Sequence, residues 1–398
     1  MVNSSVEQSE SIRVADAYRD APCFDIEAQE HKFSFYPAGK DRFDALLKHI
    51  ESAEETLQAF YYMFQDDDAG VTVRDALIEA AKRGVSVHLA IDDFGSDAPL
   101  EFFDPLVEAG ARFATFSSRW NVRYLIRNHQ KFVIVDNQRV MTGGFNVSDH
   151  YFAPPEENGW CDLGVTIEGP LAAEFRSWFD RLDAWISNDG SQFRAIREMV
   201  RDWDPGEGPV QLLLGGPTNM TSAWARELRR DLLHGNKLDL AMAYFSPPRS
   251  MRQSIERLSR SGNARLIMAG KTDNGATIGA SRSLYRKLLK SGARIAEFEP
   301  CKLHMKVLVI DDTTYFGSAN MDMRSIRLNL ELMVRVEDAD LAARMRELID
   351  HLEEHSTAIT QHWYRDRASW YNRIRWRIGY ILTAVVDYTV TRRLNLGL

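Results

Sequence analysis

The sequence predicts an α/β fold in which two repeated α/β/α halves pack about a pseudo-twofold axis, with an active site at their interface. Three observations lead to this prediction: strand-like and helix-like segments alternate, their order occurs twice, and an H-x-K-x-x-x-x-D pattern closes each series. The two copies are HQKFVIVD at residues 129–136 and HMKVLVID at 304–311. Two copies at equivalent places indicate that neither half completes the site alone.

The elements before each motif follow the same order: strand, helix, strand, helix and motif strand. In the first half they are expected at residues 56–64, 73–84, 85–92, up to 112 and 131–136. In the second half they are expected at residues 238–245, 251–262, 264–270, up to 294 and 306–311. Gly262 follows Gly84 by 178 positions, and His304 follows His129 by 175. Such similar offsets predict two copies of one unit that differ mainly in their loops.

After each motif we expect a hairpin, a further strand and an amphipathic helix. The strand and helix are expected at residues 161–169 and 170–185 in the first copy, and at 329–338 and 340–355 in the second. The longest extra loop precedes the first motif, at residues 117–128. The predicted division is an N-terminal extension, two copies of the repeated unit and a C-terminal segment, at residues 1–31, 32–200, 208–360 and 361–398.

Composition narrows the class of protein. With 398 residues, 44% hydrophobic and 27% charged, the chain is typical of soluble globular proteins. A net charge of -8 argues against sequence-independent nucleic-acid binding, so no nucleic-acid partner is expected. Three widely spaced cysteines form neither a disulfide framework nor a metal knuckle. With no signal peptide and no apolar run of roughly 20 residues, the chain is expected to stay on the cytoplasmic side.

The C-terminal segment differs from the rest of the acidic chain. Residues 365–398 contain seven Arg against two Asp, with Trp370, Tyr371, Trp376 and Tyr380 beside several Ile and Leu residues. Arg and aromatic residues around a short apolar stretch are typical of a helix that lies in a membrane interface. The alternative is an ordinary helix that packs back on the body with its Arg residues solvated.

The motif predicts which side chains face the reaction. His129 and Lys131 are two residues apart, so they leave the same face of a strand, as do His304 and Lys306. Asp136 and Asp311 complete the two motifs at odd offsets from their His, and we expect them to anchor a turn.

Small residues after each motif return the chain to the site. They lead to Asn146 and Asn320, expected to donate to a phosphate, while Ser318 either donates to the phosphate or caps the turn. Asp162 and Glu331, on the strands that follow, are expected to orient the two imidazoles.

Two His, two Lys and two Asn in one pocket suit a phosphodiester. The ammonium and amide groups can neutralise the phosphate oxygens, while one imidazole attacks phosphorus and the other transfers protons. Carboxylates with metal-ligand spacing are not found in the sequence, so neither a metal nor a cofactor is expected.

The doubled motif resembles that of the phospholipase D superfamily, and its surroundings resemble bacterial cardiolipin synthases. The segments that carry the likeness are NHQKFVIVD, GGFNVSDHY, WCDLGVTIEGP, LHMKVLVID and GSANMDMRSIRLNLEL. The resemblance covers roughly residues 20–380. It implies a metal-independent phosphatidyltransferase that forms a covalent phosphohistidine, with His129 as nucleophile and His304 as acid and base.

The resemblance also implies that each orienting carboxylate reaches across to the opposite copy, Asp162 to His304 and Glu331 to His129. The transmembrane pair found at the N-terminus of many cardiolipin synthases is not visible in this sequence. Attachment as a peripheral protein on the cytoplasmic side of the bacterial inner membrane is therefore expected through the C-terminal segment.

Four functions are compatible with the motif. The favoured one converts two phosphatidylglycerols into cardiolipin and glycerol, with phosphatidylethanolamine as an alternative lipid partner. The others are a phospholipase D that releases phosphatidic acid, a phosphodiesterase-type nuclease and a non-catalytic lipid-binding module. Arg324, close after the second motif, either holds a head group or forms a salt bridge within the fold. The oligomeric state does not follow from the sequence.

Overall fold

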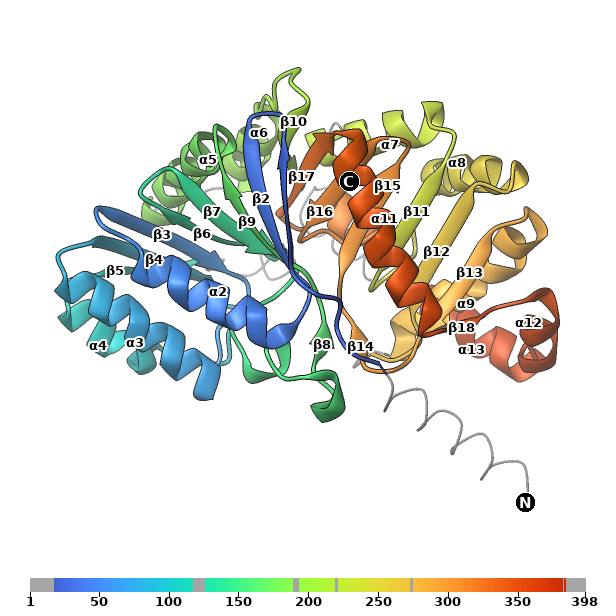
Figure 1. Cartoon of the computed structure of the whole chain (residues 1–398), viewed down its shortest axis with the longest axis horizontal. Coiled ribbons are helices and arrows are strands. Elements are labelled where there is room, and N and C mark those ends of the chain that lie inside the picture. Colours follow the sequence, from blue (N-terminus) through green and yellow to red (C-terminus); the bar gives the residue numbers. More distant parts are fainter. Residues whose placement is uncertain are drawn as a thin grey trace.

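The computed structural model describes residues 18–116, 126–188, 193–218, 221–272, 275–381 and 383. Two eight-stranded sheets lie side by side, the first in the blue-to-green half and the second in the yellow-to-red half of Figure 1. The α/β repeat predicted from the sequence is therefore confirmed. Most of the extra loop expected at 117–128 lies outside the described residues.

The first sheet contains the first motif near its centre. Its strands, in spatial order, are β1 (Phe24–Ala28), β2 (His31–Tyr36), β9 (Gly164–Glu168), β7 (Arg139–Gly143), β6 (Lys131–Val135), β3 (Thr56–Tyr61), β4 (Ser86–Asp92) and β5 (Arg112–Phe116).

The second sheet repeats this plan. Its strands, in spatial order, are β10 (Val210–Gly215), β17 (Glu331–Glu337), β16 (Thr313–Gly317), β15 (Lys306–Ile310), β11 (Leu238–Met242), β12 (Ala264–Ala269), β13 (Arg294–Phe298) and β18 (Ser356–Ala358). In each sheet the motif strand lies beside the first strand of the repeated series, β3 or β11. That strand pairs in antiparallel fashion with the motif strand, β6 or β15, and in parallel with its other neighbour, β4 or β12.

Helices cover both faces of each sheet. In the first half they are α2 (Gly39–Glu51), α3 (Asp68–Lys82), α4 (Asp104–Glu108), α5 (Leu171–Ser187) and α6 (Phe193–Arg201). In the second half they are α7 (Ala223–His234), α8 (Arg249–Arg260), α9 (Gly275–Lys290), α10 (Met323–Arg327) and α11 (Ala339–Glu354). Because both faces are covered, β6 and β15 are buried along their whole length, as their unbroken apolar runs predict.

The two halves are joined at several levels. α5 covers the first sheet and touches β10 of the second, while α11 covers the second sheet and touches β1 of the first. A two-stranded parallel sheet joins the halves directly, formed by β8 (Trp160–Cys161) and β14 (Lys302–Leu303). Three further short segments are 3-10 turns, at Leu100–Phe103, Asp149–Tyr151 and Pro155–Glu157.

The N-terminal boundary differs from the prediction. β1 lies within residues 1–31, which were expected to be an extension, yet it forms the edge of the first sheet and pairs with β2. Tyr18 is also buried: its hydroxyl lies 3.5 Å from Sγ of Cys161, and its ring centroid lies 4.9 Å from that of Phe298 in the second half. The described part of this segment therefore belongs to the folded body.

The C-terminal segment packs back on the body, which is one of the two interpretations of its sequence, and it also exposes an apolar face. It contains α12 (Gln361–Arg367) and α13 (Trp370–Tyr380), and α13 packs along α9. Trp376 and Gly379 are buried on the inner face of α13. The outer face exposes large apolar side chains, namely Trp370, Tyr371, Ile374, Ile378 and, just beyond the helix, Ile381.

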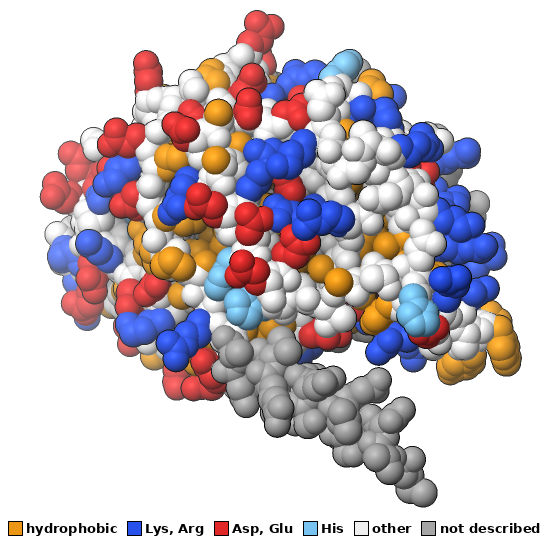
Figure 2. Space-filling view, turned by 45° about the vertical axis from the view of Figure 1, so that its right-hand side comes forward, with side chains coloured by type: hydrophobic (Ala, Val, Ile, Leu, Met, Phe, Trp, Pro, Cys, Tyr) orange, Lys and Arg blue, Asp and Glu red, His pale blue; other side chains and the backbone are white. Residues whose placement is uncertain are grey.

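These apolar side chains fall within an arc of about 100° on the helix. Figure 2 shows hydrophobic side chains beside Lys and Arg at the lower right of the molecule, where this segment lies. Within the described ranges, every helix is too short or too polar to cross a bilayer.

Candidate active site

The two motif histidines are held by backbone contacts from the opposite half. The His129 backbone N–H donates to the carbonyl of Leu330 at 2.8 Å, and the His304 N–H donates to the carbonyl of Cys161 at 2.8 Å. Each His lies two residues before its Lys, and that Lys begins a buried motif strand. The motif strands therefore bring both imidazoles to the interface between the halves.

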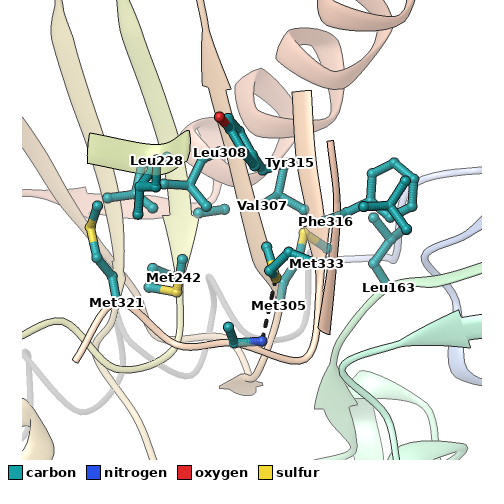
Figure 3. Packing of buried hydrophobic residues seen from close by; sticks show 14 of the residues in the cluster. Leu163, Leu228, Met242, Met305, Val307, Leu308, Tyr315, Phe316, Met321 and Met333 are labelled. Carbon is teal, nitrogen blue, oxygen red and sulfur yellow. Dashed lines mark hydrogen bonds between the residues drawn. The ribbon is translucent and has the colours of Figure 1, made fainter. Parts of the chain in front are cut away.

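The second motif strand is supported by a dense apolar core. Figure 3 shows Val307 and Leu308 of β15 among Met242, Tyr315 and Met333, with Leu163 of the first half beside Phe316. Residues of both halves thus pack in one cluster around β15. Such close packing holds the strand in place.

The orienting carboxylates are exchanged between the halves. Nδ1 of His129 lies 3.1 Å from Oε2 of Glu331, and Nδ1 of His304 lies 2.7 Å from Oδ2 of Asp162. The crossing contacts implied by the resemblance are therefore present. With Nδ1 donating to a carboxylate, each imidazole keeps Nε2 for a substrate.

Both carboxylates are fully buried and supported by further donors. Oε1 of Glu331 accepts from the Ser325 hydroxyl at 2.8 Å, and Oε2 accepts from the Ser318 hydroxyl at 2.6 Å. The Leu163 N–H donates to Oδ1 of Asp162 at 2.8 Å. Burial raises the pKa of each carboxyl, but the adjacent imidazole and lysine overcome it and hold both pKa values below the usual range.

Two details of this arrangement differ from the sequence expectation. Asp162 lies in the link between β8 and β9 instead of on the strand itself, while Glu331 begins β17. The Ser318 hydroxyl is fully buried on Glu331 and accepts from the Leu332 N–H at 3.1 Å. This geometry favours a role in holding the carboxylate over direct contact with a phosphate.

The two lysines lie behind the imidazoles. Nζ of Lys131 donates to the His129 carbonyl at 2.5 Å, and Nζ of Lys306 donates to the His304 carbonyl at 2.5 Å. Nζ of Lys306 also lies 3.0 Å from Nε2 of His304. Burial lowers the pKa of Lys131 well below its usual value, against the attraction of Glu331.

The surroundings of both imidazoles favour their neutral form. Burial lowers the pKa of His129 to about 4, with Lys131 adding to the effect and Glu331 opposing it. Burial likewise lowers the pKa of His304 to about 3, with Lys306 adding and Asp162 opposing. A neutral imidazole has the free lone pair that a nucleophile or general base requires.

A cavity of about 390 Å³ opens over the two histidines. Aromatic rings surround His304: the ring centroids of Trp160, Tyr151 and Tyr244 lie 4.6, 5.3 and 6.5 Å from its own. The lining also includes Tyr62, Arg127, Asn146, Thr277, Ala280, Asn320, Asp322, Arg324 and Thr383. The cavity thus takes its wall from both halves, from α9 and from the C-terminal segment.

The two asparagines differ in their bonding. Oδ1 of Asn146 accepts from the Met63 N–H at 3.1 Å, and its amide donates to the Tyr151 hydroxyl at 2.8 Å. A primary amide carries two hydrogens, so Asn146 has a second one that can bind a ligand. Asn320 lies at the equivalent position of the second half and also lines the cavity. Contact with a phosphate remains a prediction for both.

The motif aspartates anchor turns, as expected from their spacing. Asp136 has a left-handed backbone, with φ 52°, and accepts from the N–H groups of Glu55 and Thr56 at 2.8 and 2.9 Å. Asp311 has φ 49° and accepts from the N–H groups of Asn236 and Lys237. Both carboxylates tie the motif hairpin to the loop before the neighbouring strand.

Sequence reasoning missed two residues that position the site. Arg42 on α2 is fully buried and donates to the Asp162 carbonyl at 2.8 Å and to the Pro37 carbonyl at 2.9 Å. Gln130, between the first His and Lys, donates to the Glu331 carbonyl at 3.3 Å and accepts from Nε1 of Trp178 at 2.8 Å. No local sequence signal marks these long-range contacts.

Comparisons with known proteins agree with the repeat. A family model described as cardiolipin synthase, PLD-like domain, matches residues 46–183 and 231–353, so each matched region contains one motif. Cardiolipin synthase 1 of Bacillus cereus is 31% identical over 349 residues, which cover 83% of this chain and 68% of that protein. The major cardiolipin synthase of Bacillus subtilis is 29% identical over 361 residues, covering 87% and 74%.

A solved structure shares the architecture. The phosphatidylserine synthase of Haemophilus influenzae matches with a TM-score of 0.71 at 14% identity, covering 92% of this chain and 96% of that one. At this identity the likeness shows the fold alone. Because the family model covers most of both halves and the relatives align over most of the chain, this protein belongs to the cardiolipin synthase family with phospholipase D-like domains.

Proposed function

We propose that this chain is a phosphatidyltransferase that converts two molecules of phosphatidylglycerol into cardiolipin and glycerol. The observation that carries the proposal is the cavity between the halves, where two neutral imidazoles are each backed by a carboxylate of the opposite half. The names of its relatives, which are cardiolipin synthases, support the choice of lipid substrates.

In the first step Nε2 of His129 attacks the phosphorus of the donor lipid. A P–N bond forms, the P–O bond to glycerol breaks, and His304 supplies the proton to the departing oxygen. Because the pKa of His304 is low, about 3, its imidazole takes up this proton from water as the substrate binds. The negative charge of the bound phosphodiester favours that protonation.

In the second step the acceptor hydroxyl displaces His129 from phosphorus. His304, now neutral, takes the proton of the acceptor hydroxyl, whose oxygen attacks phosphorus while the P–N bond to His129 breaks. Lys131 and Lys306 lie beside the histidines, where their charges can offset the negative charge on the phosphoryl oxygens. One phosphodiester replaces another, so the reaction requires no nucleotide.

The same proposal includes peripheral attachment to the cytoplasmic face of the bacterial inner membrane. Thr383, just after α13, lines the cavity together with Thr277 and Ala280 of α9. The exposed apolar face of α13 therefore lies close to the opening through which a lipid would enter. Arg373, Arg375 and Arg377 on the same helix would meet anionic lipid head groups.

The test is one incubation of purified protein with phosphatidylglycerol vesicles in EDTA, with the products resolved by mass spectrometry. Cardiolipin and glycerol in equal amounts are the expected products. His129→Ala and His304→Ala should each lower the rate by about 10²- to 10⁴-fold or more, since each group acts in the transition state. Phosphatidic acid as the sole lipid product would replace the proposal with hydrolysis.

A further inference from the structure

Two arginines line the cavity. Arg127 comes from the first half, directly before Asn128 and His129, and Arg324 comes from α10 of the second half. Asp322 is the carboxylate among the described lining residues, and it caps α10 by accepting from the Ser325 N–H at 2.8 Å. Two guanidinium groups against one carboxylate leave this wall positive.

Both guanidinium groups lie near the same tyrosine. Tyr62, Arg127 and Arg324 line the same cavity. Burial raises the pKa of Tyr62, the charge of Asp92 adds to that rise, and the charges of Arg127 and Arg324 oppose it. The Tyr62 ring centroid lies 4.8 Å from that of His129. The rings that surround His304, those of Tyr151, Trp160 and Tyr244, are uncharged.

The two arginines come from segments that also support His129. The Arg127 guanidinium stacks on the Phe94 ring, 4.4 Å from its centroid, and the Arg127 carbonyl accepts from the Leu330 N–H at 2.9 Å. Arg324 belongs to the short helix whose Ser325 hydroxyl donates to Glu331. The backbones of both residues are thus joined to the segments around Glu331.

The reaction needs a second anion site that the motif residues do not supply. The phosphohistidine, Lys131 and Lys306 surround the reacting phosphoryl group, but a phosphatidylglycerol acceptor brings a phosphate of its own. Three carbons separate that phosphate from the attacking hydroxyl, so both anions must share one small cavity. Two like charges at such short range repel strongly unless a cation lies beside the second. Water and free glycerol bring no charge.

We infer that Arg127 and Arg324 form a subsite for the phosphate of the acceptor glycerophospholipid. This inference rests on the proposed transferase function. With the acceptor hydroxyl at His304, the glycerol unit spans the cavity towards the wall that carries the two arginines. Guanidinium groups suit this task because their planar N–H donors match phosphate oxygens. The subsite selects an anionic alcohol over water and so favours transfer over hydrolysis.

The test compares an anionic with a neutral acceptor in the same protein. Cardiolipin formation from phosphatidylglycerol needs the acceptor phosphate, whereas exchange of labelled glycerol into phosphatidylglycerol uses the same donor and phosphohistidine with an uncharged acceptor. Arg127→Ala and Arg324→Ala should each slow cardiolipin formation by about tenfold or more, since a charge-assisted hydrogen bond is lost. Glycerol exchange should stay within about threefold, and the share of phosphatidic acid should rise.

A matched control is Arg74→Ala. The Arg74 guanidinium also stacks on a phenylalanine, 4.4 Å from the Phe102 ring centroid, but Arg74 is not among the cavity-lining residues. It should leave both reactions unchanged. Equal losses of both reactions in Arg127→Ala and Arg324→Ala, or no loss in either, would overturn the subsite. A wild-type protein that forms no cardiolipin and exchanges no glycerol would instead overturn the proposed function.

Discussion

The two histidine–carboxylate pairs have the same His contact but differ in the other donors to the carboxylate. Glu331 receives hydroxyl donors from Ser318 and Ser325 in addition to His129, while Asp162 receives the backbone N–H of Leu163 in addition to His304. Both pairs cross the interface. Each half therefore contains an imidazole that it cannot orient and a carboxylate that it does not use for its own histidine.

This crossing predicts which variants are rescued by a substrate whose leaving group needs no proton. A p-nitrophenyl ester of phosphatidic acid releases an oxygen that needs no proton, so the loss of the general acid is tolerated with it. Asp162→Asn should therefore behave like His304→Ala, and Glu331→Gln like His129→Ala, in the extent of rescue by this substrate. Each carboxylate variant should lose about 10²-fold or more with phosphatidylglycerol.

The grouping does not depend on which histidine is the nucleophile. Rates of phosphatidylglycerol and p-nitrophenyl ester cleavage, measured for the four variants, show which carboxylate variant groups with which histidine variant. If Asp162→Asn followed His129→Ala, the carboxylates would serve the histidines of their own halves and the crossing would carry no catalytic role.

His49 links a surface helix to the motif strand and makes stability depend on pH. Nε2 of His49 on α2 lies 3.2 Å from the Val133 carbonyl of β6, and burial lowers the pKa of His49 from 6.5 to about 4. Between these values the unfolded chain binds the extra proton and the folded protein does not. Stability is therefore lost as pH falls from 6.5 towards 4, by about 3 kcal/mol at most from this group.

His49→Gln should remove this part of the acid sensitivity. The drop in free energy of unfolding between pH 7 and pH 4.5, measured in urea, should be smaller by about 2 kcal/mol than in the wild type. Acid effects of other groups cancel, because they occur in both proteins. His362→Gln, at a side chain that is 81% exposed, is the control and should match the wild type. An unchanged pH dependence in His49→Gln would show that His49 is protonated in the folded protein.

At the residue scale, the sequence could predict what depends on local geometry. The strand period places His and Lys on one face, and the odd offset of Asp136 and Asp311 predicts their turn-anchoring role. Arg42 could not be found this way. In sequence it is one more arginine on an amphipathic helix, and only the fold brings it to carbonyls such as that of Asp162, 120 positions away.

Helix α13 has one face that is buried against the body and one that is exposed. Its inner face packs so closely on α9 that a side chain at Gly379 would place Cβ 2.8 Å from the Ala276 carbonyl oxygen, and the Trp376 backbone lies 3.5 Å from a Cβ built at Gly279. Its outer face leaves half of Ile374 and of Ile378 exposed. Packing on the body and an apolar surface beside the cavity are thus properties of the same helix.

The outer face can be tested without disturbing the inner one. Ile374→Glu combined with Ile378→Glu should weaken binding to phosphatidylglycerol vesicles by at least tenfold, because two apolar side chains no longer enter the interface. Turnover of a soluble short-chain diester should stay within twofold. Leu233→Glu, at an apolar side chain on α7 that is also 53% exposed, is the matched control and should leave vesicle binding unchanged.

Sedimentation with vesicles measures the binding, and an assay with the short-chain diester measures the turnover. Gly379→Leu should instead lower turnover of phosphatidylglycerol and of the short-chain diester, because it moves α13 from α9 and disturbs the cavity wall at Thr383. Vesicle binding that survives the double substitution would rule out this face as the membrane contact.

The order of the repeated elements could be predicted, but the short strands β1, β8 and β14 could not. Alternation and repeat offsets predict the two large sheets because these are patterns of many residues. β8 and β14 contain two residues each, and their pairing joins positions 160–161 to 302–303. β1 was assigned to an extension because short edge strands carry little apolar periodicity. Short elements are defined by partners that lie far away in sequence.

For the whole molecule, the distribution of the core explains why two halves act as one. One buried cluster runs through the second half and across the interface to the inner face of the first sheet, while a separate cluster within residues 46–152 lies on the outer side of the first half. Phe35 of β2 belongs to the shared cluster, and its ring centroid lies 5.4 Å from that of Phe316 on β16. The position of one catalytic set relative to the other depends on this shared core.

This arrangement predicts that equal losses of packing have unequal effects on catalysis. Phe35→Leu and Phe103→Leu both alter a fully buried phenylalanine, the first in the shared cluster and the second in the separate one. Each should lower the free energy of unfolding by about 1 kcal/mol. Only Phe35→Leu should lower kcat, by about threefold to tenfold, because a small shift between the halves separates each histidine from its carboxylate. Thermal unfolding and cardiolipin formation measured on both variants decide the matter: equal kcat values at equal stability would mean that the shared core does not set the geometry of the site.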